Sequence, residues 1–426
     1  MLQVNYIRQN PALVKERLEV RNFPHTGLVD TILEIDESLR KAKSVTENLQ
    51  ASVNSTSKEI GMLMAKGDKE TAEAKKAEVA ALKSELSEKT TALAEMEAAF
   101  TKNILLLPNL PHSSVPKGKS AEDNEVVRQG GTMPDLPAAA VPHWDLIKKY
   151  DLIDFETGAK IAGSGFPLYK GKGAKLQRSL IQFFLDYNTE AGYTEYLPPL
   201  MVNENTAYGT GQLPDKEGQM YHITADGLYM IPTAEVPVTN VYSNEIVKES
   251  DLPVKMTAYT PCFRREAGSF GSDVRGLNRV HQFDKVEIIQ LVHPQKSYEV
   301  LEDMVNHVEK LLNLLQLPYR ILRLCGGDMG FTSALTYDFE VFSAAQQKWL
   351  EVSSVSNFES FQTNRMKIRY KDDSGKTQLL HSLNGSSLAL PRIVAALLEN
   401  NQTETGIRLP QILHAYFGAA GIELAG

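Results

Sequence analysis

The sequence is poor in cysteine and contains no long apolar run. Its two cysteines, Cys262 and Cys325, stand alone, with no Cys-x-x-Cys pair and no paired histidines nearby. This excludes a disulfide framework and the usual spacing of a zinc site, so no zinc is expected. No run is long enough to cross a bilayer, and the first ten residues lack the apolar centre of a signal peptide. We therefore expect a protein of the reducing cytoplasm that does not contact a membrane.

An excess of positive charge is also missing. The net charge of −8 argues against bulk electrostatic attraction to nucleic acid, so any RNA contact must come from local patches or from shape. The hydrophobic content of 42% and the charged content of 23% are those of an ordinary globular protein. A chain of 426 residues is long enough for two or more domains with a large core.

The motifs of parallel-sheet nucleotide enzymes are absent. The run 165–172 is similar to a P-loop, but its spacing is one residue too long, and Gly173 stands where Ser or Thr should bind magnesium. There is no G-x-G-x-x-G between a strand and a helix, no H-E-x-x-H and no Ser-His-Asp order. His-Ile-Gly-His and Lys-Met-Ser-Lys-Ser, the signatures of Rossmann-type synthetases, are missing as well. A parallel-sheet nucleotide fold is therefore disfavoured.

What is present begins with a long periodic signal. Apolar and small residues recur three and four positions apart over 32–63 and again over 72–100, with a polar break at 66–69. Two heptad stretches around Gly67 predict an antiparallel coiled-coil hairpin over about 28–102, with arms roughly 50 Å long. We expect this hairpin to project from an N-terminal domain, 1–110, and to contact another macromolecule. The pattern leaves protein, RNA and a second copy open.

The second predicted domain, 111–426, combines many strand-like runs with few helices. Helices are predicted over 174–191, 295–315 and 388–400 from their apolar periodicity. The strand-like runs are 193–197, 221–223, 228–231, 256–263, 280–292, 319–324, 337–342, 348–355 and 366–370. Because strands and helices hardly alternate, we expect an α+β domain with an antiparallel sheet flanked by helices.

The stretch 260–287 combines arginine and glycine between two β-prone runs. This pattern predicts two antiparallel strands joined by a long loop that contains Gly268, Gly271 and Gly276. Arginines lie in or beside the loop, namely Arg264, Arg265, Arg275 and Arg279. Their planar, permanently charged forks suit phosphates and carboxylates. The alternative for this stretch by itself is a surface hairpin whose arginines are solvated.

Three separated segments follow the order of the motifs of class II aminoacyl-tRNA synthetases. These are Pro199 after a predicted helix and strand, F-R-R-E at 263–266, and N-G-S-S-L-A-L-P-R at 384–392, which opens the last predicted helix. Longer blocks closely resemble bacterial-type seryl-tRNA synthetases: F-R-R-E-A-G-S-F-G-S-D-V-R-G-L-N-R-V-H-Q-F-D-K-V-E, T-A-E at 233–235, Y-G-T-G-Q-L-P at 208–214 and E-V-S-S-V-S-N-F at 351–358. The resemblance covers essentially the whole chain. Departures at Val274, Asn278, 363–364 and 390–391 remove no charged catalytic group.

The resemblance implies a reaction and its partners. L-serine and ATP would give seryl-adenylate, and serine would then pass to the 3′ end of tRNA(Ser), and of tRNA(Sec) where that tRNA is present. The coiled-coil arm would bind the long variable arm of the tRNA across a homodimer formed through the Pro199 region. Two alternatives are an enzyme that loads a carrier protein and a non-catalytic coiled-coil adaptor. The full-length heptads argue against the first, and the retained Arg264, Glu266, Glu351 and Arg392 argue against the second.

The resemblance also implies roles for individual residues. Arg264 would bridge the serine carboxylate and the α-phosphate, and Glu287 would accept the serine hydroxyl. The catalytic set is Arg264, Glu351 and Arg392. The serine-binding set is Thr233, Ala234, Glu235, Arg264, Glu287, Asn384 and Ser386. The ATP-binding set is Arg264, Arg265, Glu266 at the adenine amino group, Arg279 at the terminal phosphates, Val280, Phe283, Glu351, Val352, Ser353, Ser354 and Arg392. Glu351 and Ser354 would hold Mg²⁺ with ATP. The glycine-rich loop is expected to become ordered when ATP or the tRNA end arrives.

Overall fold

The computed structural model describes residues 1–215, 217–267 and 275–423, which form two compact units. The first unit comprises Met1–Glu19 and Phe23–Pro108, and the second comprises Val20–Asn22 and Asn109–Gly426. Among the described helices, none has both the length and the apolar character that a membrane span requires.

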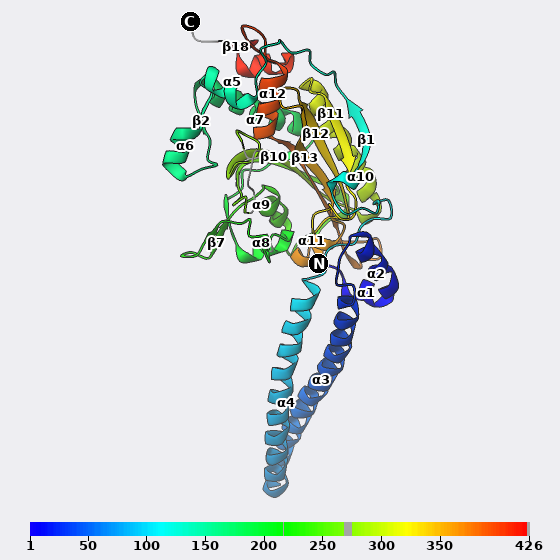
Figure 1. The fold of residues 1–426 in the computed structure, drawn as a ribbon. Helices are drawn as coiled ribbons and strands as arrows, with labels where there is room; N and C mark the ends of the chain where they lie inside the picture. Colours follow the sequence, from blue (N-terminus) through cyan, green and yellow to red (C-terminus); the bar gives the residue numbers. More distant parts are fainter. Residues whose placement is uncertain (216, 268–274, 424–426) are drawn as a thin grey trace. The chain divides into compact units, whose positions relative to one another are not determined.

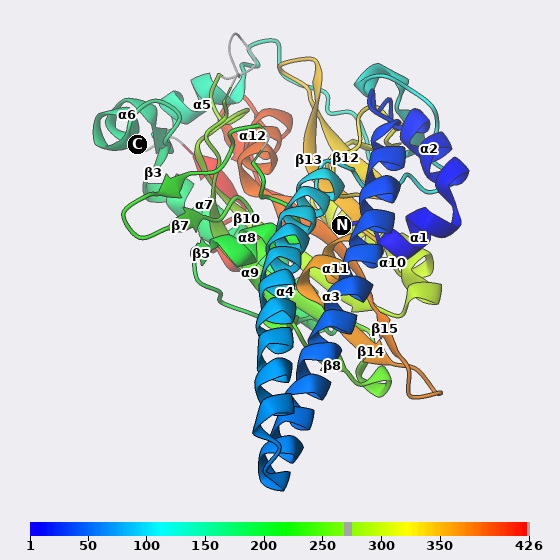
Figure 2. The same cartoon turned by 90° about the horizontal axis from the view of Figure 1, so that it is seen from below.

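The first unit is a helical hairpin with two short helices at its base. Its helices are α1 (Val4–Gln9), α2 (Pro11–Val20), α3 (Leu28–Lys66) and α4 (Lys69–Ile104). Figures 1 and 2 show α3 and α4 side by side along their lengths. Ile32 and Val53 of α3 and Ala72 and Val79 of α4 are buried along the shared seam, as the periodic pattern predicts. The coiled-coil hairpin is therefore confirmed.

The turn of the hairpin has a local cause. Gly67 ends α3 in the left-handed conformation at φ 82°, where its N–H bonds the carbonyls of Leu63 and Met64. The Asp68 side chain then accepts a hydrogen bond from Thr71 N and caps α4. A glycine after one helix and a capping carboxylate before the next thus reverse the chain within a few residues.

The second unit is built on an eight-stranded sheet in the order β1-β11-β12-β13-β16-β10-β9-β4. Every neighbouring pair is antiparallel except β4 with β9. The strands are β1 (Glu125–Gly130), β4 (Thr194–Glu195), β9 (Val254–Phe263), β10 (Gln282–Val292), β11 (Tyr319–Arg323), β12 (Leu335–Ser343), β13 (Lys348–Asn357) and β16 (His381–Ala389). This architecture confirms the predicted α+β fold with an antiparallel sheet.

Three long helices, α7 (Gly171–Glu190), α10 (Ser297–Leu314) and α12 (Leu390–Asn400), cover the sheet. Their apolar side chains join one core with Ile288 of β10 and Phe339 of β12, which are fully buried. On β10 the even-numbered Val286 and Ile288 lie in this core, whereas the odd-numbered residues lie on the opposite face. The helices therefore close one face of the sheet and leave the other for a site.

Smaller elements surround the sheet. The helices are α5 (His143–Lys149), α6 (Phe155–Ala162), α8 (Glu204–Thr210), α9 (Glu235–Thr239), α11 (Phe361–Met366) and α13 (His414–Phe417). The strands are β2 (Ile153–Asp154), β3 (Leu168–Tyr169), β5 (Met201–Asn203), β6 (His222–Ile223), β7 (Leu228–Met230), β8 (Ile246–Val247), β14 (Arg369–Lys371), β15 (Thr377–Leu379), β17 (Gly406–Arg408) and β18 (Gly421–Glu423). Of these, α9 contributes Glu235 to the pocket on the open face of the sheet.

Two predicted segments were wrong in the second unit. The run 384–389 was expected to open the last helix, but it belongs to β16, and the helix begins at Leu390. Long-range pairing decides this, because Ser386 pairs with Glu287 of β10 and Val355 of β13 pairs with Gly385. The strand predicted over 366–370 begins only at Arg369, since Met366 ends α11 and Lys367 is left-handed at φ 54°.

Candidate active site

A pocket of about 370 Å³ lies on the open face of the sheet, where β9, β10, β13 and β16 meet. All predicted site residues except Ala234 and Arg265 line it. They are Thr233, Glu235, Arg264, Glu266, Arg279, Val280, Phe283, Glu287, Glu351, Val352, Ser353, Ser354, Asn384, Ser386 and Arg392. Segments more than a hundred residues apart in the sequence thus converge on one cavity.

Strand β10 supplies the floor of the pocket. Phe283, Lys285 and Glu287 alternate along it and face the cavity, while the residues between them face the core. The Gly-containing strand β16 lies alongside and contributes Asn384 and Ser386. Its position is also fixed from β13, because Ser353 Oγ donates a 2.6 Å hydrogen bond to the Ser386 carbonyl.

One end of the pocket holds two buried carboxylates. Glu235 Oε1 accepts a 2.6 Å hydrogen bond from Gln362 Nε2, and its backbone N–H donates to Thr233 Oγ1 at 3.2 Å. Burial raises the pKa of Glu235 to about 7, although the hydrogen bond from Gln362 opposes this rise. Glu287 Oε2 lies 2.6 Å from Lys285 Nζ in a buried ion pair, and it accepts no hydrogen bond from the residues that the structure describes.

The other end of the pocket is rich in arginine. The Arg264 guanidinium lies 5.2 Å from the centre of the Phe283 ring, which is a cation–π distance. Arg279 Nη1 lies 3.0 Å from Glu266 Oε2. Arg392 donates to the Glu351 carbonyl at 2.8 Å. These contacts fix the guanidinium groups and leave donors for an anionic ligand.

The donor set on β12 and β13 suits a hard divalent cation. Glu351 and Ser354 line the pocket from β13, and Asp338 of β12 lies opposite Ser354 in the strand register. Desolvation, together with the negative charge of Glu351, raises the pKa of Asp338 well above its usual range. Asp338 Oδ1 is buried and has no hydrogen-bond partner among the described residues. Among the described residues no group of three or more His, Cys, Asp or Glu is arranged to hold a metal ion. The Glu351 carboxylate and the Ser354 hydroxyl nevertheless offer oxygen ligands of the kind that Mg²⁺ accepts.

Two predicted residues lie elsewhere. Ala234 is fully buried in a separate apolar cluster with Val238 and Met256. The Arg265 side chain is exposed, and its backbone N–H donates to the Gln219 carbonyl at 2.9 Å. Arg264 lines the pocket, whereas the adjacent Arg265 does not. The prediction that the loop becomes ordered falls on 268–274, which lie outside the described residues.

The pocket is also lined by residues that were not predicted from the sequence. They include Gln212, Leu277, Asn278, Lys285, Ser356, Phe358, Ala389 and Pro391. Lys285 could have been found, because it lies midway between Phe283 and Glu287 on a predicted strand and so shares their face. Gln212 and Phe358 come from loops whose position only the folded chain sets.

The fold and the pocket together define a class of protein. Residues 221–401 match the family model described as the tRNA synthetase class II core domain (G, H, P, S and T), and residues 1–111 match the seryl-tRNA synthetase N-terminal domain. An antiparallel sheet whose open face carries arginines, carboxylates and an aromatic ring is thus the catalytic core of a class II aminoacyl-tRNA synthetase.

Similar proteins narrow this class further. The serine–tRNA ligase of Salinibacter ruber is 52% identical over 424 residues, which cover 99% of each chain. That of Neisseria meningitidis serogroup B is 46% identical over 428 residues and 98% of each chain. The crystal structure of seryl-tRNA synthetase from Pyrococcus horikoshii, complexed with ATP, is 33% identical with a TM-score of 0.91 and covers 100% of both chains. The chain belongs to the seryl-tRNA synthetase family and is a ligase.

Proposed function

We propose that this ligase activates L-serine with ATP in the pocket on the sheet and then transfers serine to the 3′ end of tRNA(Ser), and of tRNA(Sec) where present. One observation carries the proposal. The pocket joins a buried carboxylate end, Glu235 and Glu287, to an arginine end, Arg264, Arg279 and Arg392. The first end suits a small amino acid with an ammonium and a hydroxyl group, and the second suits a polyphosphate.

The proposed chemistry needs positioning rather than a protein nucleophile. A serine carboxylate oxygen attacks the α-phosphorus of ATP, and the bond from that phosphorus to the bridging oxygen breaks, which releases pyrophosphate. A hydroxyl of the terminal tRNA ribose then attacks the acyl carbon and AMP leaves. Arg264 belongs to the arginine end, and its charge also acts on Glu235 at the carboxylate end. It would bind the serine carboxylate and the α-phosphate together, which offsets the repulsion between the two anions.

Serine would be recognised by the carboxylates. Glu287 Oε2, which is ion-paired with Lys285 but accepts no hydrogen bond from the described residues, would accept the hydrogen bond of the serine hydroxyl. Alanine lacks that hydroxyl and would leave a buried oxygen unpaired, which discriminates strongly between two amino acids of similar size. Glu235 and Thr233 would bind the ammonium group, and Asn384 and Ser386 would complete the wall of this subsite.

ATP would occupy the arginine end. Phe283 would stack on the adenine with Arg392 on the other side, Glu266 would accept from the adenine amino group, and Arg279 would bind the terminal phosphates. Glu351 and Ser354 would hold a Mg²⁺ ion, which would supply positive charge beside the phosphates of ATP.

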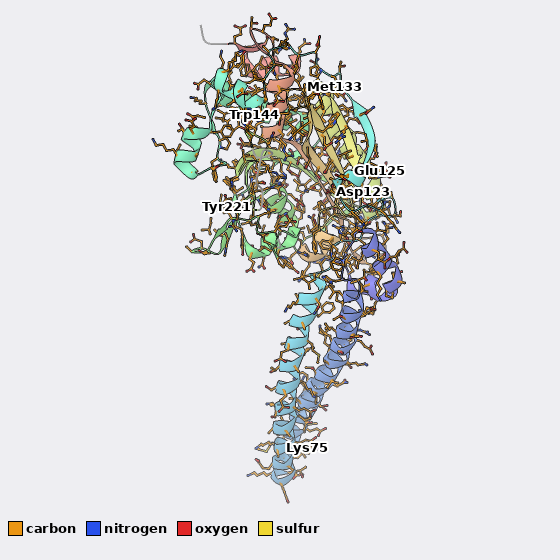
Figure 3. All side chains as sticks on the ribbon, viewed as in Figure 1. Lys75, Asp123, Glu125, Met133, Trp144 and Tyr221 are labelled. Carbon is orange, nitrogen blue, oxygen red and sulfur yellow. The ribbon has the colours of Figure 1, made fainter. Side chains whose placement is uncertain are left out.

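The coiled-coil hairpin would bind the tRNA. Double-stranded RNA is read through its backbone and shape, which an arm of balanced charge can do with a few lysines. Near the turn, Lys58, Lys66 and Lys69 are exposed. Lys75, labelled in Figure 3, lies 2.9 Å from Glu78 and 3.3 Å from Glu59. The first three are therefore the better candidates for phosphate contacts in the long variable arm of tRNA(Ser).

We also propose a cytoplasmic homodimer formed through the Pro199 region. Leu197 has 87% of its surface exposed and Met201 has 47%, so the two flank Pro199 with apolar surface that a second copy would cover. The buried thiols of Cys262 and Cys325 are unpaired, as is usual for proteins of the reducing cytoplasm.

One experiment tests the proposed function. Amino-acid-dependent ATP–pyrophosphate exchange is measured with each of the twenty amino acids, and then charging of total tRNA is measured with the active one. We expect exchange with serine alone, followed by charging of serine acceptors. Exchange without tRNA charging would favour an enzyme that loads a carrier protein, and the absence of any exchange would favour an adaptor.

A further inference from the structure

A buried histidine outside the proposed pocket joins two distant segments of the second unit. His143, the first residue of α5, has no exposed surface. Its Nδ1 lies 2.7 Å from Glu399 Oε1 of α12. On the other side of the ring, Nε2 lies 2.9 Å from the backbone nitrogen of Leu277. None of the proposed reaction steps uses this histidine.

The partners decide the state of the ring. A backbone N–H can only donate, so His143 Nε2 must be the acceptor of the hydrogen bond from Leu277. Glu399 is ionised, because hydrogen bonds from His143 and Ser343 outweigh its burial and hold the pKa of Glu399 below its usual value. Its carboxylate can therefore only accept, and His143 Nδ1 must carry the proton. The ring is neutral and has a single tautomer.

Glu399 is held as firmly as the ring. Oε1 accepts hydrogen bonds from His143 N at 2.9 Å and Gln346 Nε2 at 2.8 Å besides the ring, and Oε2 accepts one from Ser343 Oγ. A carboxylate with this many donors has one orientation. It therefore fixes the plane of the imidazole, and with it the direction of the lone pair on Nε2.

The backbone that His143 binds is a wall of the proposed ATP site. Leu277 and Asn278 line the pocket next to Arg279. The same turn is held twice more, since the Asn278 carbonyl accepts from Arg392 Nε at 3.1 Å and Asn278 Nδ2 donates to Gln346 Oε1 at 3.1 Å. The His143–Glu399 pair and Gln346 therefore support one side of the turn, and Arg392 supports the other.

Two further contacts place the ring against this turn. Gly276 has a φ of 66°, and a Cβ added there would lie 2.3 Å from His143 Nε2, so the approach requires glycine. The neighbouring Trp144, labelled in Figure 3, lies under the Arg275 guanidinium at 4.6 Å from its ring centre. The beginning of α5 thus fixes the segment that leads into Arg279.

We propose that His143, oriented by Glu399, is a positioning residue that sets the Leu277–Asn278 wall of the pocket and thereby the affinity for ATP but not for serine. The inference rests on the proposed ATP site. Serine would bind near Glu235 and Glu287, whose hydrogen bonds and ion pair involve Gln362, Thr233 and Lys285 rather than Leu277 or Asn278.

Two isosteric variants test the proposal. In His143→Asn the amide nitrogen can replace Nδ1 as donor to Glu399, but no atom reaches Leu277 N. In His143→Gln the amide oxygen can replace Nε2 as acceptor from Leu277 N. We expect H143N to raise the KM for ATP in serine-dependent exchange about tenfold, and H143Q to stay within about threefold of the unchanged protein. The KM for serine should change less than about twofold in both.

Amide exchange gives a second readout. Hydrogen–deuterium exchange of the peptide that contains Leu277 should be faster in H143N than in H143Q. If H143N does not fold, Gln346→Met is measured in its place. Gln346 is half-buried, and its replacement removes the hydrogen bond that it accepts from Asn278 Nδ2 of the same wall. Q346M should therefore also raise the KM for ATP. The proposal would be overturned by equal KM values for ATP in H143N and H143Q. It would also be overturned by an unchanged KM for ATP in folded H143N and in Q346M.

A control separates this inference from the ATP site on which it rests. Phe283→Ala removes the proposed adenine platform and should raise the KM for ATP whatever the role of His143. An effect of F283A without an effect of H143N leaves the ATP site standing and refutes only the positioning role. Serine-dependent exchange that does not respond to F283A would instead refute the ATP site.

Discussion

At the scale of single residues, Glu235 and Glu287 lie in one pocket but in unlike surroundings. Glu287 is ion-paired with a buried lysine, whereas the Glu235 side chain accepts a hydrogen bond from the Gln362 amide and has a raised pKa. The first carboxylate suits a permanent acceptor for a hydroxyl group. The second suits a group whose charge depends on the ligand, because the serine ammonium would favour its ionised form.

Removal of the Glu287 carboxylate should affect serine far more than ATP. We expect Glu287→Ala to lower kcat/KM for serine at least about a hundredfold, since a buried charge-assisted hydrogen bond is lost, while the KM for ATP changes little. Exchange kinetics with each substrate varied in turn measure this. Asp284→Ala is the matched control, because Asp284 lies three positions earlier on the same strand and accepts a hydrogen bond from the Tyr259 hydroxyl, with neither residue lining the pocket. Unchanged serine kinetics in E287A would refute the assignment.

Serine binding should depend on pH through Glu235. Its pKa of about 7 means that the carboxyl group is increasingly neutral below that value, so the KM for serine should rise as the pH is lowered from about 8 to about 6. The stability of the protein without serine should depend on pH in the opposite sense. A carboxyl whose pKa is raised by folding contributes stability below its unfolded value of 4.5, and this stability is lost as the pH rises through about 7.

Two measurements check this behaviour. The KM for serine should rise as the pH is lowered from about 8 to about 6 in the unchanged protein, whereas it should not change with pH in Glu235→Gln. In addition, the increase in melting temperature that serine causes should grow with pH over the same range, because the ammonium compensates the buried charge. A flat profile in the unchanged protein would show that Glu235 does not bind the ammonium.

At the scale of elements, the hairpin and the sheet carry separate tasks. The α3–α4 seam is made by residues that are close in sequence across a short turn, so its geometry is set within the first unit. The pocket is made by β9, β10, β13 and β16 of the second unit. Activation of serine and binding of the tRNA arm should therefore be separable by mutation.

Deletion of 32–100 should spare adenylate formation and abolish tRNA charging. The deletion removes the proposed tRNA arm but no residue of the pocket. Serine-dependent exchange and charging of tRNA(Ser) measure the two steps in the same preparation. Charging with undiminished kcat/KM for tRNA would refute the role of the hairpin.

A milder change should act in the same direction. Replacing Lys58, Lys66 and Lys69 with glutamine should lower the affinity for tRNA(Ser) and reduce the salt dependence of binding, because fewer phosphates are neutralised. The matched control replaces Lys41, Lys75 and Lys76, which are paired with Glu37, Glu78 and Glu73. Equal losses in the two triple variants would argue against specific contacts near the turn.

At the scale of the whole molecule, the proposed homodimer makes a further prediction. Leu197→Asp combined with Met201→Asp should shift the protein from dimer to monomer in analytical ultracentrifugation, because two charges would be buried in an apolar contact. Met62→Asp is the control, since Met62 is an exposed apolar residue of the hairpin with 58% of its surface accessible. A dimer that survives both substitutions would place the interface elsewhere.

The sequence determined the parts of this protein that depend on local order. The heptads and Gly67 suffice for the hairpin, and the alternation on β10 suffices to put Phe283 and Glu287 on one face, because both follow from the period of a single element. The segments 263–266, 351–358 and 384–392 were sufficient to predict most of the pocket through their resemblance to one family. The same alternation would also have predicted that Lys285 faces the pocket.

Only the tertiary structure decided what depends on distant partners. Residues 384–389 have the composition of a helix start but form a strand, because β10 and β13 supply their hydrogen-bond partners. Arg265 and Ala234 lie within matching motifs, yet the backbone directs their side chains away from the pocket. His143 accepts a hydrogen bond from the backbone of Leu277, which is 134 positions away in the sequence. No local period encodes such a contact, because a hydrogen bond between two segments exists only once both are packed into the same core.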